Sequence, residues 1–221
     1  MQPTLLPGDY AYVSRLKSGK KKINHNDIIL FDFPYRANLS EESDVYYIKR
    51  CVALPKDTFL IKNGRYMIKG LSISLGVIEK QEEFAKELIE NDDTRMSFPY
   101  NTDLRWNFLN FGPFYIPSAG DTLPLTKENY ALYRKCVEYE TNSDLIMVGS
   151  KFFLDDKELT DYIFKENYYF VAGDFASGSE DSRYWGLLPE SSIIGKALFI
   201  WKSKNPETGK YRFDRFFNVI K

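Results

Sequence analysis

One apolar stretch, VYYIKRCVALPKD at residues 45–57, constrains the fold of this chain most strongly. Apolar and aromatic side chains surround a single basic pair, Lys49-Arg50, and Pro55 ends the run. Such a run is typical of a buried β-strand. From the strand alone, Lys49 is better explained as a solvated residue on its polar face, because lysine prefers the surface. The alternative is a lysine in apolar surroundings, where burial lowers its pKa and makes it available as a base.

Composition restricts the classes of protein to which the chain can belong. Aromatic residues make up 16% of the 221 residues, which favours strands over helices. The formal net charge of −1 argues against nucleic acid as the main partner. No signal peptide and no apolar run of about 18 residues is visible, so none of these residues is expected to span a membrane. The chain starts inside motif-like sequence, which predicts further residues upstream of Met1.

The histidine and cysteine content limits the available chemistry. His25 is the only histidine and no CxxC motif occurs. The chain therefore offers few residues for a histidine-based zinc site or a Ser-His-Asp triad. We therefore expect no metal site and no cofactor. Any hydrolytic chemistry then uses carboxylates, a cysteine without histidine, or a lysine base. Cys51 and Cys136 form either one disulfide or two unrelated buried thiols.

The pattern along the chain predicts a mainly β protein with antiparallel sheets. Asn63-Gly64 signals a hairpin, and Thr126 is a candidate helix N-cap. The basic run Lys20–Lys22 predicts a solvated loop tip, with a membrane-surface role as the alternative. Strands are expected at residues 9–16, 28–33, 45–54, 58–62, 65–69, 145–149, 151–154, 168–172 and 193–201, a strand or short helix at 212–219, and helices at 77–91 and 126–141.

The same pattern predicts a discontinuous organisation. Residues 1–65 and 165–221 form a β-rich catalytic core. Residues 66–164 form an inserted α+β subdomain to which no motif assigns a role.

Several short motifs then occur in a particular order. They are MQPTL at residues 1–5, DIILF at 27–31, YIKR followed by LPKD within 47–57, and GD followed by SEDSR within 173–183. Together they resemble the motifs of bacterial type I signal peptidases, membrane-bound serine endopeptidases that remove signal peptides with a Ser–Lys dyad. Each motif alone is weak, but their order and separation are specific.

The resemblance implies roles for particular residues. Lys49 would be the general base and Ser179 would orient its amine. Asp181 and Arg183 would form an ion pair that supports the loop, and Asp174 would fix a turn. The substrate would bind as an extended strand, with shallow pockets for small side chains lined by Met1, Leu5, Leu30, Tyr47 and Ile48.

Some positions depart from the family pattern. The nucleophilic serine would immediately precede Met1, so residues 1–221 alone are expected to be unable to cleave. Phe175 stands where the family usually has asparagine, and Lys56 replaces a glycine, which makes that turn less free. The resemblance also implies an anchor upstream in the inner membrane, a catalytic domain on the periplasmic side, and contact with the membrane surface and with preproteins.

Two other functions remain open from the sequence. One is a non-catalytic β domain that binds peptides or a membrane surface with the same groove. The other is a different Ser–Lys protease, such as a self-cleaving repressor, which the GKALFIW strand and the large insertion fit poorly.

Overall fold

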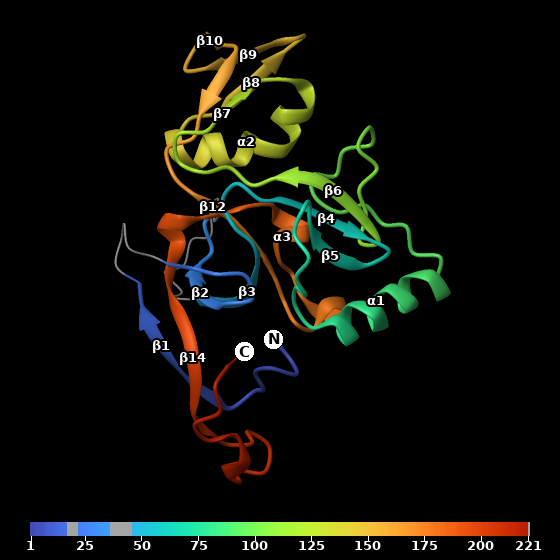
Figure 1. Cartoon of the computed structure of the whole chain (residues 1–221). Helices are drawn as coiled ribbons and strands as arrows, with labels where there is room; N and C mark the ends of the chain where they lie inside the picture. Colours follow the sequence, from blue (N-terminus) through green and yellow to red (C-terminus); the bar gives the residue numbers. More distant parts are fainter. Residues whose placement is uncertain (17–21, 36–45, 221) are drawn as a thin grey trace.

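The computed structural model of the chain describes residues 1–16, 22–35 and 46–220. Its central feature is a six-stranded sheet in which every neighbouring pair runs antiparallel (Figure 1). In spatial order the strands are β1 (Asp9–Arg15), β14 (Ile193–Ser203), β2 (Ile28–Asp32), β3 (Tyr46–Ala53), β12 (Tyr168–Ala172) and β13 (Leu188–Pro189). The mainly β, antiparallel fold predicted from the sequence is therefore confirmed. Val45, Lys20 and Lys21 lie outside the described residues.

The lysine-bearing strand β3 lies inside this sheet, between β2 and β12. Lys49 is opposite Ile29 of β2, and Arg50 is opposite Ala172 of β12. All five residues of β12 are buried, as expected for a strand that is covered on both faces. The register therefore places the Lys49-Arg50 pair beside the end of β12, where the motif-bearing loop begins.

The other strands form smaller antiparallel sheets. They are β5-β4-β6 (Arg65–Ile68, Thr58–Lys62 and Asn110–Tyr115), β10-β9-β8 (Lys157–Leu159, Lys151–Leu154 and Leu145–Val148) and β11-β7 (Asp161–Ile163 and Thr122–Pro124). Asn63 and Gly64 join β4 to β5 with φ angles of 51° and 79°, the left-handed geometry of a tight hairpin turn. This hairpin crosses the boundary proposed at residues 65 and 66, and the division into core and insertion stays a prediction.

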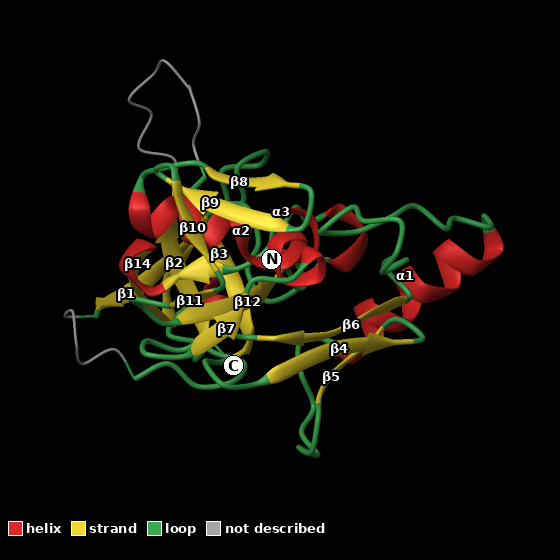
Figure 2. Cartoon of the chain, turned by 90° about the horizontal axis from the view of Figure 1, so that it is seen from above, coloured by secondary structure: helices red, strands yellow, loops and turns green. Residues whose placement is uncertain are grey.

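Helices cover parts of these sheets (Figure 2). The α-helices are α1 (Ile78–Glu90), α2 (Lys127–Thr141) and α3 (Ser182–Trp185), and the 3₁₀ helices are η1 (Ala176–Gly178), η2 (Glu190–Ser192) and η3 (Phe213–Arg215). Thr126 caps α2, since its hydroxyl accepts a hydrogen bond of 3.0 Å from the Asn129 backbone N–H. Within the described ranges, no helix is long and apolar enough to cross a membrane.

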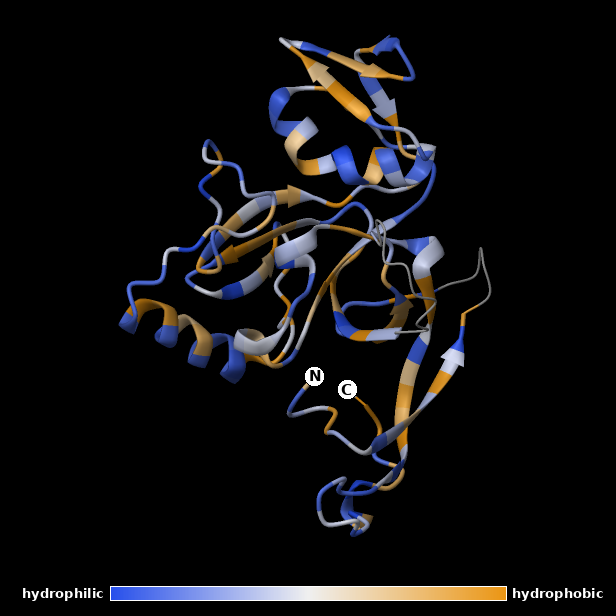
Figure 3. Cartoon of the chain, turned by 180° about the vertical axis from the view of Figure 1, so that it is seen from behind, coloured by the Kyte–Doolittle hydropathy of each residue, from blue (hydrophilic) through white to orange (hydrophobic). Residues whose placement is uncertain are grey.

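The main hydrophobic core lies between the central sheet, the β5-β4-β6 sheet and α2. Its middle is aromatic: the rings of Phe59 and Phe170 stack with centroids 4.3 Å apart. Polar and apolar residues alternate along α1 (Figure 3), and its apolar side faces the protein. Cys51 and Cys136 are both free and buried, and they belong to different core clusters. The two-thiol alternative therefore describes the structure.

The two ends of the chain lie close together (Figure 1). Arg215 of η3 forms an ion pair of 2.6 Å with Asp9 and donates a hydrogen bond of 3.0 Å to the Thr4 carbonyl. Of the strand and the short helix expected at residues 212–219, the structure contains the short helix. The C-terminal segment thus holds the N-terminal segment against the β1-β14 end of the sheet.

Candidate active site

Lys49 and Ser179 meet at the centre of the motif-bearing region. Lys49 projects from β3, and Ser179 follows η1 on the loop after β12. The amine Nζ donates a hydrogen bond of 2.7 Å to Ser179 Oγ across 130 residues of sequence. A Cβ added at Gly173 would overlap the Ser179 hydroxyl and lie 3.6 Å from Lys49 Nζ. The approach of the two side chains therefore requires glycine at this position.

The surroundings of Lys49 disfavour its charged form. Burial is the largest cause, and it lowers the pKa of Lys49 below its ordinary value. Among the charged neighbours, Asp181 and Glu180 oppose the shift, while Arg183 adds to it. Met1 lines the same cavity as Ile48, the residue that precedes Lys49 in β3. The chain around Met1 therefore lies beside the lysine strand.

Asp181 and Arg183 form a fully buried ion pair beneath this loop. Arg183 Nε lies 2.8 Å from Asp181 Oδ1, and a second guanidinium nitrogen donates to Oδ2 over 2.8 Å. The Gly173 backbone N–H also donates to Asp181, over 2.8 Å. Burial disfavours the Asp181 carboxylate, but the charge and hydrogen bonds of Arg183 outweigh it and hold the pKa of Asp181 below its usual range. The pair ties the far end of the loop to its beginning.

Asp174 anchors the N-terminal motif instead of only fixing its own turn. It accepts two hydrogen bonds of 2.7 Å from Arg50, and both side chains are almost completely buried. The Thr4 hydroxyl donates to the same carboxylate, and Arg50 also donates to the Asn26 carbonyl over 2.9 Å. Two residues of this network, Arg50 and Thr4, were missed by the sequence analysis.

The sequence held one signal for Arg50. Successive side chains of a strand point to opposite faces. Two adjacent charges in an apolar strand are therefore expected to meet different partners. The partner itself, Asp174, lies 124 residues away, and no local pattern identifies it.

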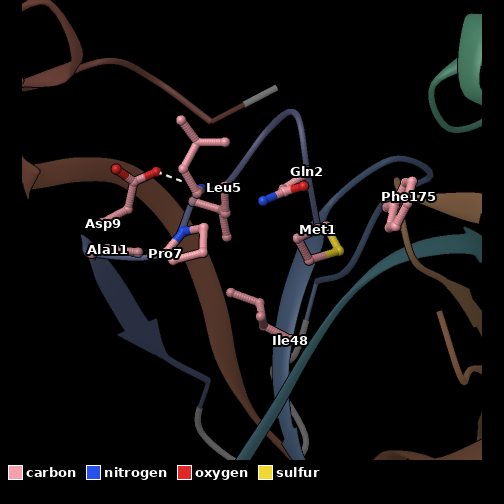
Figure 4. A pocket seen from close by; sticks show the side chains of 10 residues that line it. Met1, Gln2, Leu5, Pro7, Asp9, Ala11, Ile48 and Phe175 are labelled. Atoms are coloured by element: carbon pink, nitrogen blue, oxygen red, sulfur yellow. Dashed lines mark hydrogen bonds between the residues drawn. The ribbon is translucent and has the colours of Figure 1, made fainter. Parts of the chain in front are cut away.

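A cavity of about 630 Å³ lies beside the lysine strand (Figure 4). It is lined by Met1, Gln2, Leu5, Leu6, Pro7, Gly8, Asp9, Ala11, Ile48 and Phe175. Of the predicted substrate-binding residues, Met1, Leu5 and Ile48 line this cavity and Leu30 and Tyr47 do not.

The two remaining predicted residues lie on the neighbouring part of the sheet. Leu30 is opposite Ile48 in the β2-β3 register. Tyr47 is 38% exposed, and its ring stacks on Phe31 with centroids 6.0 Å apart. Phe175 was noted only as a departure from the family pattern, yet its ring forms one end of the cavity (Figure 4).

Metal-ligating groups do not gather at this site. Across the ranges that the structure describes, no group of three or more His, Cys, Asp or Glu side chains is placed to hold a metal ion. His25 instead contacts Asp57, with 2.7 Å between Nε2 and Oδ2. Asp57 also accepts a hydrogen bond of 2.7 Å from the Leu54 backbone N–H. The histidine therefore belongs to a turn beside β3.

Comparison with known proteins gives a consistent result. A family model described as signal peptidase, peptidase S26, matches residues 1–202. Signal peptidase I of Buchnera aphidicola subsp. Baizongia pistaciae is 29% identical over 242 residues, which cover 99% of this chain and 73% of that protein. Signal peptidase I of Buchnera aphidicola subsp. Schizaphis graminum is 30% identical over 223 residues, which cover 92% of this chain and 65% of that protein.

Among solved structures, a signal peptidase I from Enterococcus faecalis V583 aligns with a TM-score of 0.39 and 19% sequence identity. The alignment covers 80% of this chain and 97% of that one. The family model extends over more than half of the chain and includes every motif described above. The chain belongs to the signal peptidase family, peptidase S26.

Proposed function

We propose that this chain is the catalytic part of a serine endopeptidase that cleaves signal peptides from exported preproteins by Ser–Lys chemistry. The observation that carries the proposal is the 2.7 Å hydrogen bond between Lys49 Nζ and Ser179 Oγ. It joins a lysine whose pKa burial lowers to a hydroxyl that orients the amine. A neutral lysine held in this way has the properties of a general base.

The proposed nucleophile is a serine immediately before Met1, at the position given by the MQPTL motif. Neutral Lys49 takes the proton from the serine hydroxyl, and the oxygen attacks the carbonyl carbon of the scissile peptide bond. The bond to the leaving amine breaks as Lys49 returns the proton to that nitrogen. Lys49 then takes a proton from water, and the resulting hydroxide attacks the acyl ester. The bond between the acyl carbon and the serine oxygen breaks, and Lys49 returns the proton to that oxygen, which restores the serine and the neutral amine. The cavity that Met1 shares with Ile48, the residue before Lys49, supports this placement.

The cavity beside Ile48 supports an extended substrate. A preprotein segment would add to β3 along Tyr46–Lys49, which pairs with β2 on one side and lies before the residues that pair with β12 on the other, and place small side chains at positions −1 and −3 in the cavity. The backbone N–H of the nucleophilic serine, helped by a hydroxyl upstream, would stabilise the oxyanion. Residues 1–221 without that serine are expected to be inactive. A membrane anchor upstream would hold this domain against the extracytoplasmic membrane surface, close to its substrates.

The position of cleavage tests this function. The protein extended upstream through the serine and the anchor should cut a purified preprotein with alanine at −1 and −3 after the −1 residue. Tryptophan at −1 should prevent cleavage, because shallow pockets have no room for it. Mass spectrometry of the products gives the position. Replacement of the upstream serine by alanine is the control, and it should bind the preprotein without cutting it.

Two outcomes contradict the proposal. In the first, the extended protein binds the preprotein but releases no product, which is what a non-catalytic peptide-binding domain would do. In the second, the serine-to-alanine control cuts as fast as the unaltered protein, which requires a different nucleophile.

A further inference from the structure

Arg183 lies inside a cage of aromatic rings supplied by the part of the chain that carries no motif. Its guanidinium carbon is 5.9 Å from the ring centroid of Tyr66 and 5.7 Å from those of Phe84 and Phe108. Tyr66 belongs to β5, Phe84 to α1, and Phe108 to the segment before β6. Cations are attracted to the faces of such rings, more strongly when both are removed from water. We call these three rings the Arg183 cage.

Helix α1 brings the cage to the catalytic loop. Its buried side carries Gln81, Phe84, Ala85 and Leu88. Phe84 and Leu88 pack with Phe108 and with Ala176, the first residue of η1. The side chain of Gln81 fixes the helix to β5, since it accepts from the Tyr66 backbone N–H over 3.0 Å. The helix is therefore docked at one end on β5 and pressed against η1 by its apolar residues.

The cage and the helix hold the two ends of the segment that contains Ser179. On one side, Ala176 packs against α1, and its carbonyl accepts a hydrogen bond of 2.9 Å from Arg183. On the other side, Arg183 pairs with Asp181 and is only 1% exposed. Ser179 lies between these two anchors, 2.7 Å from Lys49 Nζ. A displacement of either anchor would move the hydroxyl that contacts the amine.

We propose that Phe84 and Phe108 are positioning residues for the general base, which they hold in place through Arg183, Ala176 and Ser179. This inference rests on the proposed Ser–Lys function, and it gives residues 66–164 a role in that reaction. Neither ring lines the substrate cavity, so the two act on the amine through the loop.

A loosened loop has a specific consequence for Lys49. When Ser179 withdraws, water reaches the amine and its charged form is better solvated, so its pKa rises. The charged neighbours Glu180 and Asp181 lie on the same loop, and Arg183 lies on α3 directly after it, so a loosened loop would shift them too. A smaller neutral fraction lowers kcat at neutral pH and moves the acid limb of the rate profile upward. Because Phe175 precedes Ala176 and lines the cavity, KM is expected to change as well, and the acid limb and the Lys49 pKa are the readouts that identify the positioning role.

The experiment compares two equally buried phenylalanines in the extended, serine-containing protein. Phe84 and Phe152 are each 4% exposed. Phe152 lies on β9 and contacts Tyr130 of α2, with ring centroids 5.7 Å apart. Phe84→Ala should lower kcat about tenfold or more and raise the midpoint of the acid limb. Phe152→Ala should leave both unchanged, and Phe84→Leu should give a smaller change in the same direction, because leucine refills only part of the site and supplies no ring.

A second measurement separates this inference from the proposed function. The side-chain pKa of Lys49, followed by NMR with labelled lysine, should rise in Phe84→Ala and Phe84→Leu but not in Phe152→Ala. This titration does not depend on cleavage. If the unaltered protein fails to cut preprotein, the proposed function is refuted, and the Lys49 titration still tests the positioning role. Circular dichroism shows whether each variant is folded. If Phe84→Ala does not fold, the measurements on Phe84→Leu test the proposal in its place.

Two results overturn the proposal. One is an unchanged limb and an unchanged Lys49 pKa in a folded Phe84 variant. The other is an equal change of the acid limb and of the Lys49 pKa in Phe152→Ala, which would mean that both substitutions act through a general loss of stability.

Discussion

Two adjacent residues of β3 contact different parts of the candidate site. Lys49 reaches Ser179, and Arg50 reaches Asp174 and Thr4. Side chains of neighbouring strand residues point to opposite faces, so one dipeptide connects two separate networks. One network holds the Lys49 amine and the other holds the N-terminal motif. The Met1 region and the lysine amine are thereby kept close together.

The pH dependence of activity follows from the lowered pKa of Lys49. Only the neutral amine accepts a proton, so kcat/KM should rise with pH, about tenfold per pH unit on the acid side. The midpoint should lie below 10.5, the ordinary lysine value, because burial lowers the folded-state pKa. A pH-rate profile of the serine-containing protein checks this. A limb centred at or above 10.5 would mean that Lys49 is not the base.

Short motifs identified residues that lie together in the structure, but not the partners that these residues contact. Lys49, Ser179, Asp181 and Arg183 stand in short motifs, and the structure brings all of them together. Thr4 was missed because its partner lies 170 residues away. Contacts of this kind depend on the sheet register, which local patterns do not encode.

Secondary elements were predicted well where a local rule applies. The helical spacing at residues 77–91 matches α1, and Thr126 caps α2. The Asn63-Gly64 signal marks the β4-β5 turn. What each element packs against could not be predicted, since the apolar face of α1 fits many surfaces. Its partners, the η1 loop and Arg183, follow only from the tertiary structure.

Two tyrosines on different elements provide a test of the packing around β5. Tyr66 and Tyr133 are 6% and 4% exposed. The Tyr133 hydroxyl donates a hydrogen bond of 2.9 Å to the Tyr115 carbonyl. The Tyr66 hydroxyl has no hydrogen-bond partner among the described residues. Tyr133→Phe should lower the free energy of unfolding by about 1 kcal/mol, while Tyr66→Phe should leave it unchanged or raise it, since a buried unpaired hydroxyl is costly.

Urea unfolding of the two variants measures this difference. Each substitution removes one hydroxyl from a buried ring, so the two are matched controls for each other. A loss in Tyr66→Phe as large as in Tyr133→Phe would show that the Tyr66 hydroxyl is paired, and would alter the description of the Arg183 cage.

On the scale of the whole molecule, the central sheet is assembled from both ends of the chain. Strands β1 to β3 come from the first 53 residues, and β12 to β14 begin at residue 168. The mainly β class was predictable from aromatic content and strand patterns, and the order β1-β14-β2-β3-β12-β13 was not. That order brings the N-terminal motif, the lysine strand and the SEDSR loop to one place.

The intervening region takes part in the same arrangement. Helix α1 and the segment before β6 pack on the loop that holds Ser179. The sequence offered no motif there, because apolar packing residues carry no chemical signature. These contacts are the basis for the positioning role proposed for this region. Expression of the separate parts tests the predicted division at residues 65/66 and 164/165.

The most direct test of the account is the rate of preprotein cleavage by the serine-containing protein with Lys49 replaced. Lys49→Ala should reduce cleavage to the level of the serine-to-alanine control, because the proposed mechanism uses Lys49 as its only base. Ser179→Ala should retain measurable activity with a lowered kcat, since Ser179 only orients the amine. Continued processing by Lys49→Ala at the rate of the unaltered protein would contradict the account.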